Sequence, residues 1–277
     1  ALYGGSSDFL RESRLIIATA HQVYRYMDYF DLGIVDEADA FPLYHNRWLQ
    51  SGIRRALTKT AKQIFLTATP PITWKHFGKE GKGSVVILPA RYHGYPLPVP
   101  ILKIERRLWK TIMKSLPNPT LTSFIRRVLV TEGQAILFVP RLKDVFQLYQ
   151  WLKQIPWMNE KEFAGVYAQD PERDHKIRQF RLGKVRFLIS TTILERGVTV
   201  QRCHVAIVGA DHPIFDRATL IQMAGRVGRS ALYQRGEVWL IAQEKTKAQL
   251  QAIKEIKKLN QIAKKEGISS KELYSLC

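Results

Sequence analysis

Short, uninterrupted apolar segments recur along the whole sequence, and stretches with helical character separate them. Apolar runs without polar alternation are typical of strands that are buried on both faces of a parallel sheet. The expected strands are Leu15–Ala18, Leu32–Val35, Gln63–Thr67 and Val85–Leu88, followed by Ala135–Val139, Phe163–Tyr167, Val185–Ser190, His204–Gly209 and Glu237–Ala242. The sequence therefore predicts an α/β protein made of repeated strand–helix units.

A group of prolines divides these units into two sets. Pro89, Pro96, Pro98 and Pro100 lie too close together for a helix or a central strand. We therefore expect a first α/β domain over residues 1–88, an extended linker over 89–104 and a second α/β domain over 105–277. The second domain is expected to contain helices over 121–130, 142–152 and 174–180, and to end in a lysine-rich helix over 244–266.

The composition points to a polyanionic partner. Lys and Arg total 43 against 24 Asp and Glu, and the net charge of +19 is more than solubility normally needs. No run of 18 apolar residues occurs, so no membrane span is expected. The two cysteines, Cys203 and Cys277, are too few for a disulfide scaffold or a four-cysteine zinc site. We therefore expect no zinc and a cytoplasmic location.

Two acidic residues follow one of the predicted strands. Asp36 and Glu37 come directly after Leu32–Val35, and in open α/β sheets ligands bind outside the carboxyl ends of the strands. Asp36 could hold Mg²⁺ through water, and Glu37 could orient or deprotonate an attacking water. The alternative is a helix N-terminus, where acidic side chains favour the helix dipole.

The segment Gln222–Arg229 is the most specific motif. If it is helical, Arg226 and Arg229 share a face, and Gly225 and Gly228 remove side-chain bulk beside them. Glycine weakens a helix, so a close approach by a ligand would explain the pair. A guanidinium suits phosphate recognition. The alternative is an exposed turn whose arginines form surface ion pairs.

Further polar residues follow predicted strands. Hydroxyls and backbone amides at strand ends can hold a phosphate or a sugar. The alternatives are ordinary helix caps and turns. The candidates are Thr19 and His21, Thr67 and Thr69, Arg141, Thr191 and Thr192, and the nearby Glu195-Arg196-Gly197.

In this order along the chain, the motifs resemble those of superfamily 2 helicases. The sequence is similar to the late-competence ComFA family in Asp36–Pro42, in Thr69-Pro70-Pro71, in Pro89–Gly94 and in the lysine-rich last helix. PriA-type helicases are the next most similar family. The resemblance implies two RecA-like parallel-sheet domains and a motor that uses ATP and Mg²⁺ to move along nucleic acid.

The resemblance also implies a role for each motif residue. Asp36 would coordinate Mg²⁺ and Glu37 would activate water, while Arg226 and Arg229 would be arginine fingers reaching across the cleft from the second domain. The other assignments are Gln222, Gly197 and Asp39 for nucleotide binding, Asp39, Thr67 and Thr69 for coupling ATP to DNA, and Thr19, His21, Arg141, Thr191 and Thr192 for the DNA track.

The sequence departs from these families in two ways. It has no phosphate-binding loop of the form G-x-x-x-x-G-K-S/T; the similar segment Gly78–Ser84 has Ser84 in place of the lysine and follows the acidic motif instead of preceding it. It also lacks the cysteine-rich zinc module of ComFA proteins. We therefore expect a piece whose first domain is truncated at its N-terminus, with an unpaired strand edge and poor ATP hydrolysis on its own.

The expected function is that of the motor core of a single-stranded DNA translocase that drives DNA uptake in natural transformation. Its partners would be single-stranded DNA and other competence proteins, which could bring it to the inner face of the membrane; it could also form oligomers. One alternative is a PriA-like or restriction-type helicase acting on duplex or forked DNA. Others are a generic RNA helicase and a non-catalytic DNA-binding module with a degenerate helicase fold.

Overall fold

The computed structural model describes residues 13–39, 42–70, 74, 83–91, 93–192, 200–230, 233 and 236–267. The chain divides into two compact units, Ala1–Val86 and Ile87–Cys277. Each unit has its own sheet, and every strand pair in both sheets is parallel.

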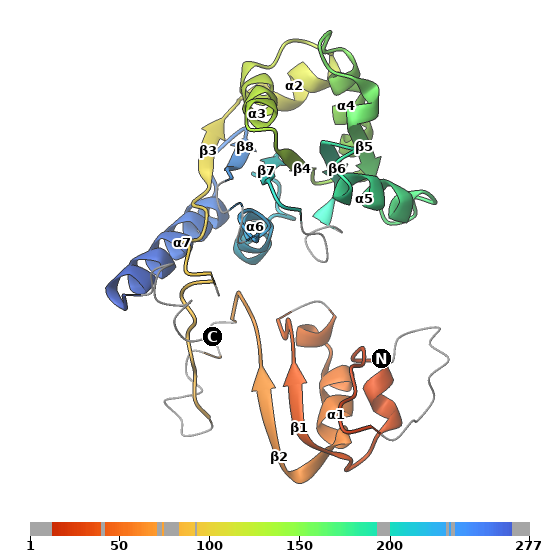
Figure 1. Ribbon diagram of the computed structural model, residues 1–277, viewed down its shortest axis with the longest axis vertical. Helices are drawn as coiled ribbons and strands as arrows, with labels where there is room; N and C mark the ends of the chain where they lie inside the picture. The colour runs from red at the N-terminus through yellow and green to blue at the C-terminus, as the bar shows by residue number, and fades with distance from the viewer. Residues whose placement is uncertain are drawn as a thin grey trace. The chain divides into compact units, whose positions relative to one another are not determined.

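The second unit is built on a six-stranded sheet with the order β3-β8-β7-β4-β6-β5 (Figure 1). Its inner strands consist almost entirely of buried residues, as the apolar runs in the sequence predict. In chain order the strands are β3 (Ile101–Ile104), β4 (Gln134–Phe138), β5 (Phe163–Val166), β6 (Phe187–Ser190), β7 (Cys203–Val208) and β8 (Val238–Ala242).

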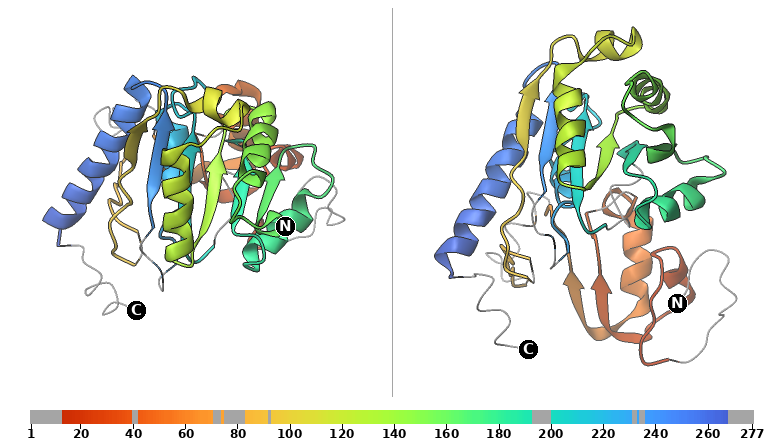
Figure 2. Two further views of the ribbon diagram at one scale, coloured as in Figure 1. Left: turned by 90° about the horizontal axis from the view of Figure 1, so that it is seen from above. Right: turned by 45° about the horizontal axis from the view of Figure 1, so that its top comes forward.

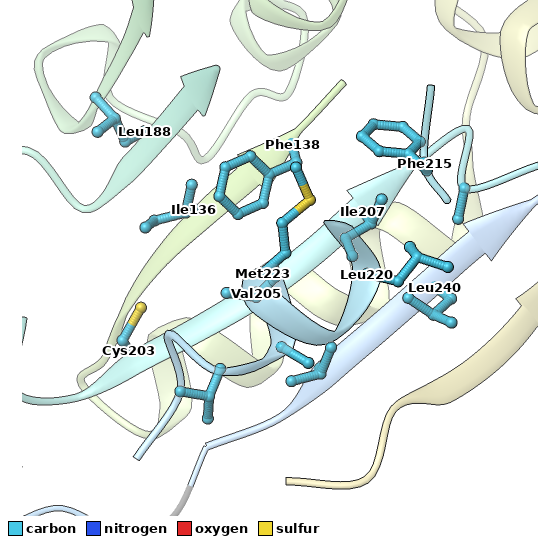
Figure 3. Packing of buried hydrophobic residues seen from close by; sticks show 14 of the residues in the cluster. Ile136, Phe138, Leu188, Cys203, Val205, Ile207, Phe215, Leu220, Met223 and Leu240 are labelled. Carbon is cyan, nitrogen blue, oxygen red and sulfur yellow. The ribbon is translucent and has the colours of Figure 1, made fainter. Parts of the chain in front are cut away.

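Helices cover both faces of this sheet, which explains why its strands lack polar alternation (Figure 2). One face carries α2 (Leu108–Met113), α3 (Pro119–Val130) and α4 (Leu142–Lys153), and the other carries α5 (Arg173–Arg181), α6 (Arg217–Ala224) and α7 (Lys247–Lys265). Figure 3 shows the second of these layers, where Leu220 and Met223 of α6 belong to the same buried cluster as Phe138 of β4.

Side-chain caps mark where three helices of the second unit, α3, α6 and α7, begin. The Asn118 side chain accepts a hydrogen bond from the Leu121 N–H at 3.0 Å and Asp216 accepts one from the Thr219 N–H at 2.8 Å. Thr246 and Gln249 form a reciprocal capping box at the start of α7. Such caps satisfy backbone donors that have no partner within the helix. The Asp216 cap matters for the site, because α6 leads into the glycine–arginine segment.

The whole stretch expected as a linker, residues 89–104, belongs to the second unit. Ile101–Ile104 forms β3, the edge strand beside β8. Ahead of it, the backbone of Leu97 exchanges two hydrogen bonds with the Asn260 side chain of α7, at 2.8 and 2.9 Å. The linker prediction is therefore corrected over 101–104, because prolines exclude a central strand but not an edge strand that begins after Pro100.

The first unit contains a two-stranded sheet of β1 (Phe30–Val35) and β2 (Leu57–Phe65), which α1 (Arg47–Ala56) connects. Two short 3₁₀ turns, Gln22–Arg25 and Leu43–His45, precede α1. Apolar side chains on these strands are exposed: the exposed fraction is 50% for Leu32, 59% for Ile34 and 45% for Ile64. The sequence predicts strands that are buried on both faces. In the structure, the described residues of the first unit instead leave apolar side chains of both strands exposed.

Two further predictions for strands are wrong. Within the described residues, neither Leu15–Ala18 nor Val85–Leu88 forms a strand, and Leu15 and Leu88 are largely exposed. An apolar run becomes a strand only where a neighbouring strand accepts and donates its backbone hydrogen bonds. No helix in the described part of the chain is long and apolar enough to cross a membrane.

Candidate nucleotide and nucleic-acid site

The acidic motif forms a tight turn at the carboxyl end of β1. Asp36 is exposed, and its Oδ1 accepts a hydrogen bond from the Glu37 N–H at 2.9 Å. Glu37 has a φ of 50°, a left-handed conformation that non-glycine residues adopt rarely and often at functional sites. The turn is tied to the end of β2, because the Ala38 N–H donates to the Leu66 carbonyl at 3.0 Å.

Asp39 joins this turn to the threonine motif after β2. Its Oδ1 accepts a hydrogen bond from Thr67 Oγ1 at 2.6 Å, and its Oδ2 accepts one from Thr69 Oγ1. Thr67 Oγ1 also accepts a hydrogen bond from the Thr69 N–H at 3.0 Å. Thr69 is buried, with 2% of its surface exposed. The structure therefore brings Asp39, Thr67 and Thr69 together and links the two turns by side-chain hydrogen bonds.

The acidic turn fits a hydrated Mg²⁺ ion. Mg²⁺ prefers carboxylate oxygens and keeps several waters, and the exposed Asp36 carboxylate is accessible to such an ion. The described residues contain no group of three or more His, Cys, Asp or Glu side chains placed to hold a metal ion directly. When bound next to these acidic residues, Mg²⁺ would neutralise the negative charge of a phosphate group.

The glycine–arginine motif is a turn and not a continuous helix. α6 ends at Ala224, Gly225 is its C-cap, and Gly228 has a φ of 69°. The prediction that Arg226 and Arg229 share a helix face is therefore wrong, because α6 ends before both of them and the left-handed Gly228 turns the chain between them. Arg226 is 3% exposed, whereas Arg229 is exposed and its Nε donates to the Gly225 carbonyl at 2.9 Å. Gln222 lies half-buried in the last turn of α6.

Two residues that the sequence analysis gave no role lie against this turn. The Arg91 guanidinium donates to the carbonyls of Gly225, Val227 and Gly228, and His93 Nε2 lies 3.0 Å from the Gly228 carbonyl oxygen. Burial, and then the nearby Arg229, lowers the pKa of Arg91 to about 10. The available signal was Pro89–Gly94, which contains both residues but no motif with a known mechanism.

Beneath the turn lies a buried thiol. Burial raises the pKa of Cys203 to about 12, although the charges of Arg226 and Arg229 act in the opposite direction. The thiol therefore stays protonated at neutral pH and acts as a small apolar side chain.

The carboxyl ends of β4, β6 and β5 form a second group of candidates. These strands are parallel neighbours, so the residues after them share one edge of the sheet. Arg141 follows β4 and makes two hydrogen bonds to the buried carboxylate of Asp144, at 2.8 and 3.2 Å. Thr191 and Thr192 follow β6 and are half-buried. Gly197 and its neighbours Glu195 and Arg196 lie outside the described residues.

An aromatic pair at the same edge was missed by the sequence analysis. Phe146 of α4 and Tyr167, directly after β5, have ring centroids 5.7 Å apart, and Phe146 is 52% exposed. The periodicity of α4 predicts Phe146 on its buried face, but the ring lies where that face reaches solvent at the carboxyl edge. Exposed rings at such an edge can stack on nucleobases.

The other nucleic-acid candidates lie in the first unit. Thr19 and His21 are exposed in the turn that begins the first 3₁₀ helix, where the Thr19 carbonyl accepts a hydrogen bond from the Gln22 N–H at 2.9 Å. The structure thus divides the predicted site. The first unit carries Thr19, His21, Asp36, Glu37, Asp39, Thr67 and Thr69, and the second carries Arg141, Thr191, Thr192, Gln222, Arg226 and Arg229.

Sequence comparison finds competence proteins. The chain is 39% identical over 269 residues to the competence protein ComFA of Bacillus subtilis, which covers 96% of this chain and 56% of that protein. It is 34% identical to ComFA of Streptococcus pneumoniae, covering 95% of this chain and 60% of that protein. The chain therefore spans less than two thirds of the length of these relatives. The family of the helicase conserved C-terminal domain matches residues 120–231.

Solved structures show the same fold. Saccharomyces cerevisiae Dbp5 bound to RNA and ADP BeF3 matches with a TM-score of 0.62 at 20% identity, covering 94% of this chain and 71% of that one. The DEAD-box helicase Mss116 bound to single-stranded RNA matches with a TM-score of 0.58 at 15% identity, covering 80% of this chain and 47% of that one. The two parallel-sheet units thus have the RecA-like fold of these helicases. Over nearly its whole length the chain is therefore similar to the ComFA competence proteins, and its second unit carries a match to the helicase conserved C-terminal domain on a RecA-like fold.

Proposed function

We propose that this chain is part of the motor core of an ATP-dependent translocase that moves single-stranded DNA during natural transformation. The similarity to two competence proteins over nearly the whole chain supports a role in natural transformation. The observation that best supports a motor function is the pair of hydrogen bonds that Thr67 and Thr69 donate to Asp39. They couple an acidic turn suited to Mg²⁺ to a second turn, and simple DNA binding requires no such coupling.

The chemistry proposed is hydrolysis of ATP. Asp36 holds Mg²⁺ through water, Glu37 orients the attacking water, and Gln222 contacts the nucleotide. Arg226 and Arg229 stabilise the charge that develops on the transferred phosphoryl group, a role in which a guanidinium contributes a large part of the rate. The sequence contains no lysine-bearing phosphate loop, so we propose that this chain alone hydrolyses ATP poorly and that native upstream sequence supplies the loop.

The DNA track proposed for the second unit is the edge with the carboxyl ends of β4, β6 and β5. Arg141 retains free N–H donors for a phosphate beyond the two that bond Asp144, and Thr191 and Thr192 supply hydroxyls. The Phe146–Tyr167 pair supplies a stacking surface. Backbone contacts combined with aromatic stacking suit a single strand, whose bases are not paired. Thr19 and His21 are the corresponding candidates in the first unit.

The test is movement of the protein along DNA without a duplex to unwind. We expect the chain, extended by its native upstream sequence, to displace streptavidin from biotinylated single-stranded DNA in the presence of ATP and Mg²⁺. Asp39→Ala should reduce displacement far more than it reduces ATP hydrolysis, because it uncouples the two turns. Efficient unwinding of a forked duplex without movement on a single strand would favour a PriA-like or restriction-type helicase instead.

A further inference from the structure

Arg91 places one guanidinium on three backbone carbonyls of the glycine–arginine turn. Its Nη1 donates to Val227 O at 2.5 Å and Gly228 O at 2.6 Å, and its Nη2 donates to Gly225 O at 3.0 Å. The last carbonyls of a helix have no partner within the helix, so a helix that stops before such a turn needs outside donors. A rigid, planar group with five N–H donors suits this better than any other side chain.

His93 adds a second contact to the same turn. It is 1% exposed, its Nε2 lies 3.0 Å from Gly228 O, and its Nδ1 accepts a hydrogen bond from the Tyr95 N–H at 3.3 Å. Because Nδ1 accepts, the ring proton lies on Nε2, which donates to Gly228 O. The Gly228 carbonyl thus receives donors from both Arg91 and His93.

The segment that carries these two residues is itself anchored within the second unit. Its later part is fixed by the two hydrogen bonds between Leu97 and Asn260 and by the pairing of β3 with β8. The contacts with α7 and with the edge of the sheet therefore fix the segment that contains Arg91 and His93. Through these two residues, elements other than α6 stabilise the turn.

The carbonyls held by Arg91 belong to the residues that flank Arg226 and Arg229. The Gly225 carbonyl joins directly to the Arg226 amide, and the Gly228 carbonyl joins directly to the Arg229 amide. Arg229 Nε also donates to Gly225 O, the same oxygen that Arg91 Nη2 contacts. Fixing these peptide groups fixes the directions in which both arginine side chains leave the backbone.

We propose that Arg91 and His93 are positioning residues that set the orientation of Arg226 and Arg229 for ATP hydrolysis. This inference rests on the function proposed above. Neither residue needs to touch the nucleotide: Arg91 uses both terminal nitrogens on carbonyls, and His93 is buried. Small misplacements of catalytic groups lower the rate of the chemical step by large factors.

The test compares Arg91→Lys and His93→Gln with Asn260→Ala in the chain extended by its native upstream sequence. Lysine keeps the charge but presents a single point donor, so it cannot reproduce the planar contact with three carbonyls. Asn260→Ala loosens the same segment at Leu97 without touching the turn. Thermal unfolding of all three variants is measured first, and DNA-stimulated ATP hydrolysis is then assayed well below their unfolding temperatures.

We expect Arg91→Lys to lower kcat by roughly 10- to 100-fold with KM for ATP and the Kd for single-stranded DNA within twofold of wild type. His93→Gln should lower kcat less, because its amide can still donate to Gly228 O. Asn260→Ala should keep wild-type kcat even if its unfolding temperature falls as far. Hydrogen exchange at Arg226–Arg229 amides in the present chain should accelerate in Arg91→Lys and not in Asn260→Ala.

Three distinct outcomes would overturn the inference. If the wild-type extended chain does not hydrolyse ATP, the proposed function fails and the inference fails with it. If the wild type is active and Arg91→Lys retains its kcat, the motor survives and the positioning role is wrong. A loss of kcat in Asn260→Ala equal to that in Arg91→Lys would also contradict positioning, since it would reflect only the general stability of the segment.

Discussion

Arg226 and Arg229 lie three residues apart but have different surroundings. Arg226 is buried beside Cys203, whereas Arg229 is exposed and bonded to the Gly225 carbonyl. Both lie beyond the end of α6 at Ala224, and the left-handed backbone of Gly228 turns the chain between them. At this scale the sequence singles out the two arginines as candidates but does not give their geometry, because the Arg91 guanidinium that bonds this turn lies 134 or more residues away in the sequence.

Replacement of Arg226 distinguishes the hypothesis of an ATP-driven motor from that of a DNA-binding module. In the chain extended by its native upstream sequence, Arg226→Ala is expected to lower ATP hydrolysis by about 10³-fold or more, the usual effect of losing an arginine finger. Binding of single-stranded DNA should remain near wild type. The control is Arg178→Ala, at an exposed position of α5. In a binding module, Arg226→Ala would leave any nucleotide turnover unchanged and reduce only the salt dependence of DNA binding slightly.

His204 makes the stability of the second unit sensitive to acid. It is 4% exposed, its Nδ1 accepts a hydrogen bond from the Glu237 N–H at 3.2 Å, and its Nε2 lies 3.0 Å from Thr131 Oγ1. Burial lowers the pKa of His204 below its usual value, although Glu237 acts in the opposite direction. The unfolded chain then binds the proton more readily than the folded one.

The free energy of unfolding should therefore fall as the pH drops below about 6.5, the ordinary pKa of histidine, and approach a constant once the pH is below the folded pKa. Urea unfolding between pH 8 and pH 5 measures this. His204→Gln should flatten the part of the profile due to this residue. An identical pH profile for wild type and His204→Gln would contradict the assignment.

At the scale of elements, the strands predicted from the sequence agree closely with those observed in the second unit, and agree less well in the first. The inner strands β4, β6, β7 and β8 are apolar runs that helices cover on both faces, so hydrophobicity alone locates them. Leu15–Ala18 and Val85–Leu88 are equally apolar, but among the described residues neither forms a continuous strand, and only Ala18 makes an isolated bridge. Strand formation there depends on partners that a local pattern does not contain.

The aromatic pair on α4 and after β5 gives a prediction about single-stranded DNA. Phe146→Ala should weaken binding of oligothymidylate by about 1–3 kcal/mol, the usual contribution of one stacked base. The unfolding free energy should change little, because 52% of the side chain is already exposed. The measurement is fluorescence anisotropy of a labelled oligonucleotide at fixed salt.

Trp157 supplies the matched control for this experiment. It is also an exposed aromatic residue, at 41%, but it lies in the connection from α4 into β5, which reaches the opposite edge of the sheet. Trp157→Ala should therefore leave the affinity unchanged. Equal losses in both variants would show that exposed aromatic surface in general, and not the carboxyl edge, binds the strand.

At the scale of the whole molecule, two units with separate cores divide the candidate residues between them. The resemblance to superfamily 2 helicases could be recognised from the order of the motifs alone. The order of motifs is a property of the sequence and does not require knowledge of their local geometry. The roles of Arg91 and His93 could not be drawn, because they are defined by backbone carbonyls and not by residue type.

The net charge of +19 also belongs to the whole molecule. We expect DNA affinity to fall steeply with salt, with log K linear in log salt concentration and a slope of about −0.7 for each phosphate contacted on a single strand. Arg141→Gln should reduce the steepness of this slope by about one contact. A slope close to zero would mean that the charge serves only solubility.

The most direct measurement is ATP hydrolysis with and without single-stranded DNA, by this chain and by the chain extended with its native upstream sequence. We predict that only the extended chain turns over and that single-stranded DNA stimulates it, because the acids and arginines described above need a phosphate-binding loop to act. Robust DNA-stimulated hydrolysis by this chain alone would contradict the need for that loop. No hydrolysis by either chain would contradict the motor itself and leave a DNA-binding module with a degenerate helicase fold.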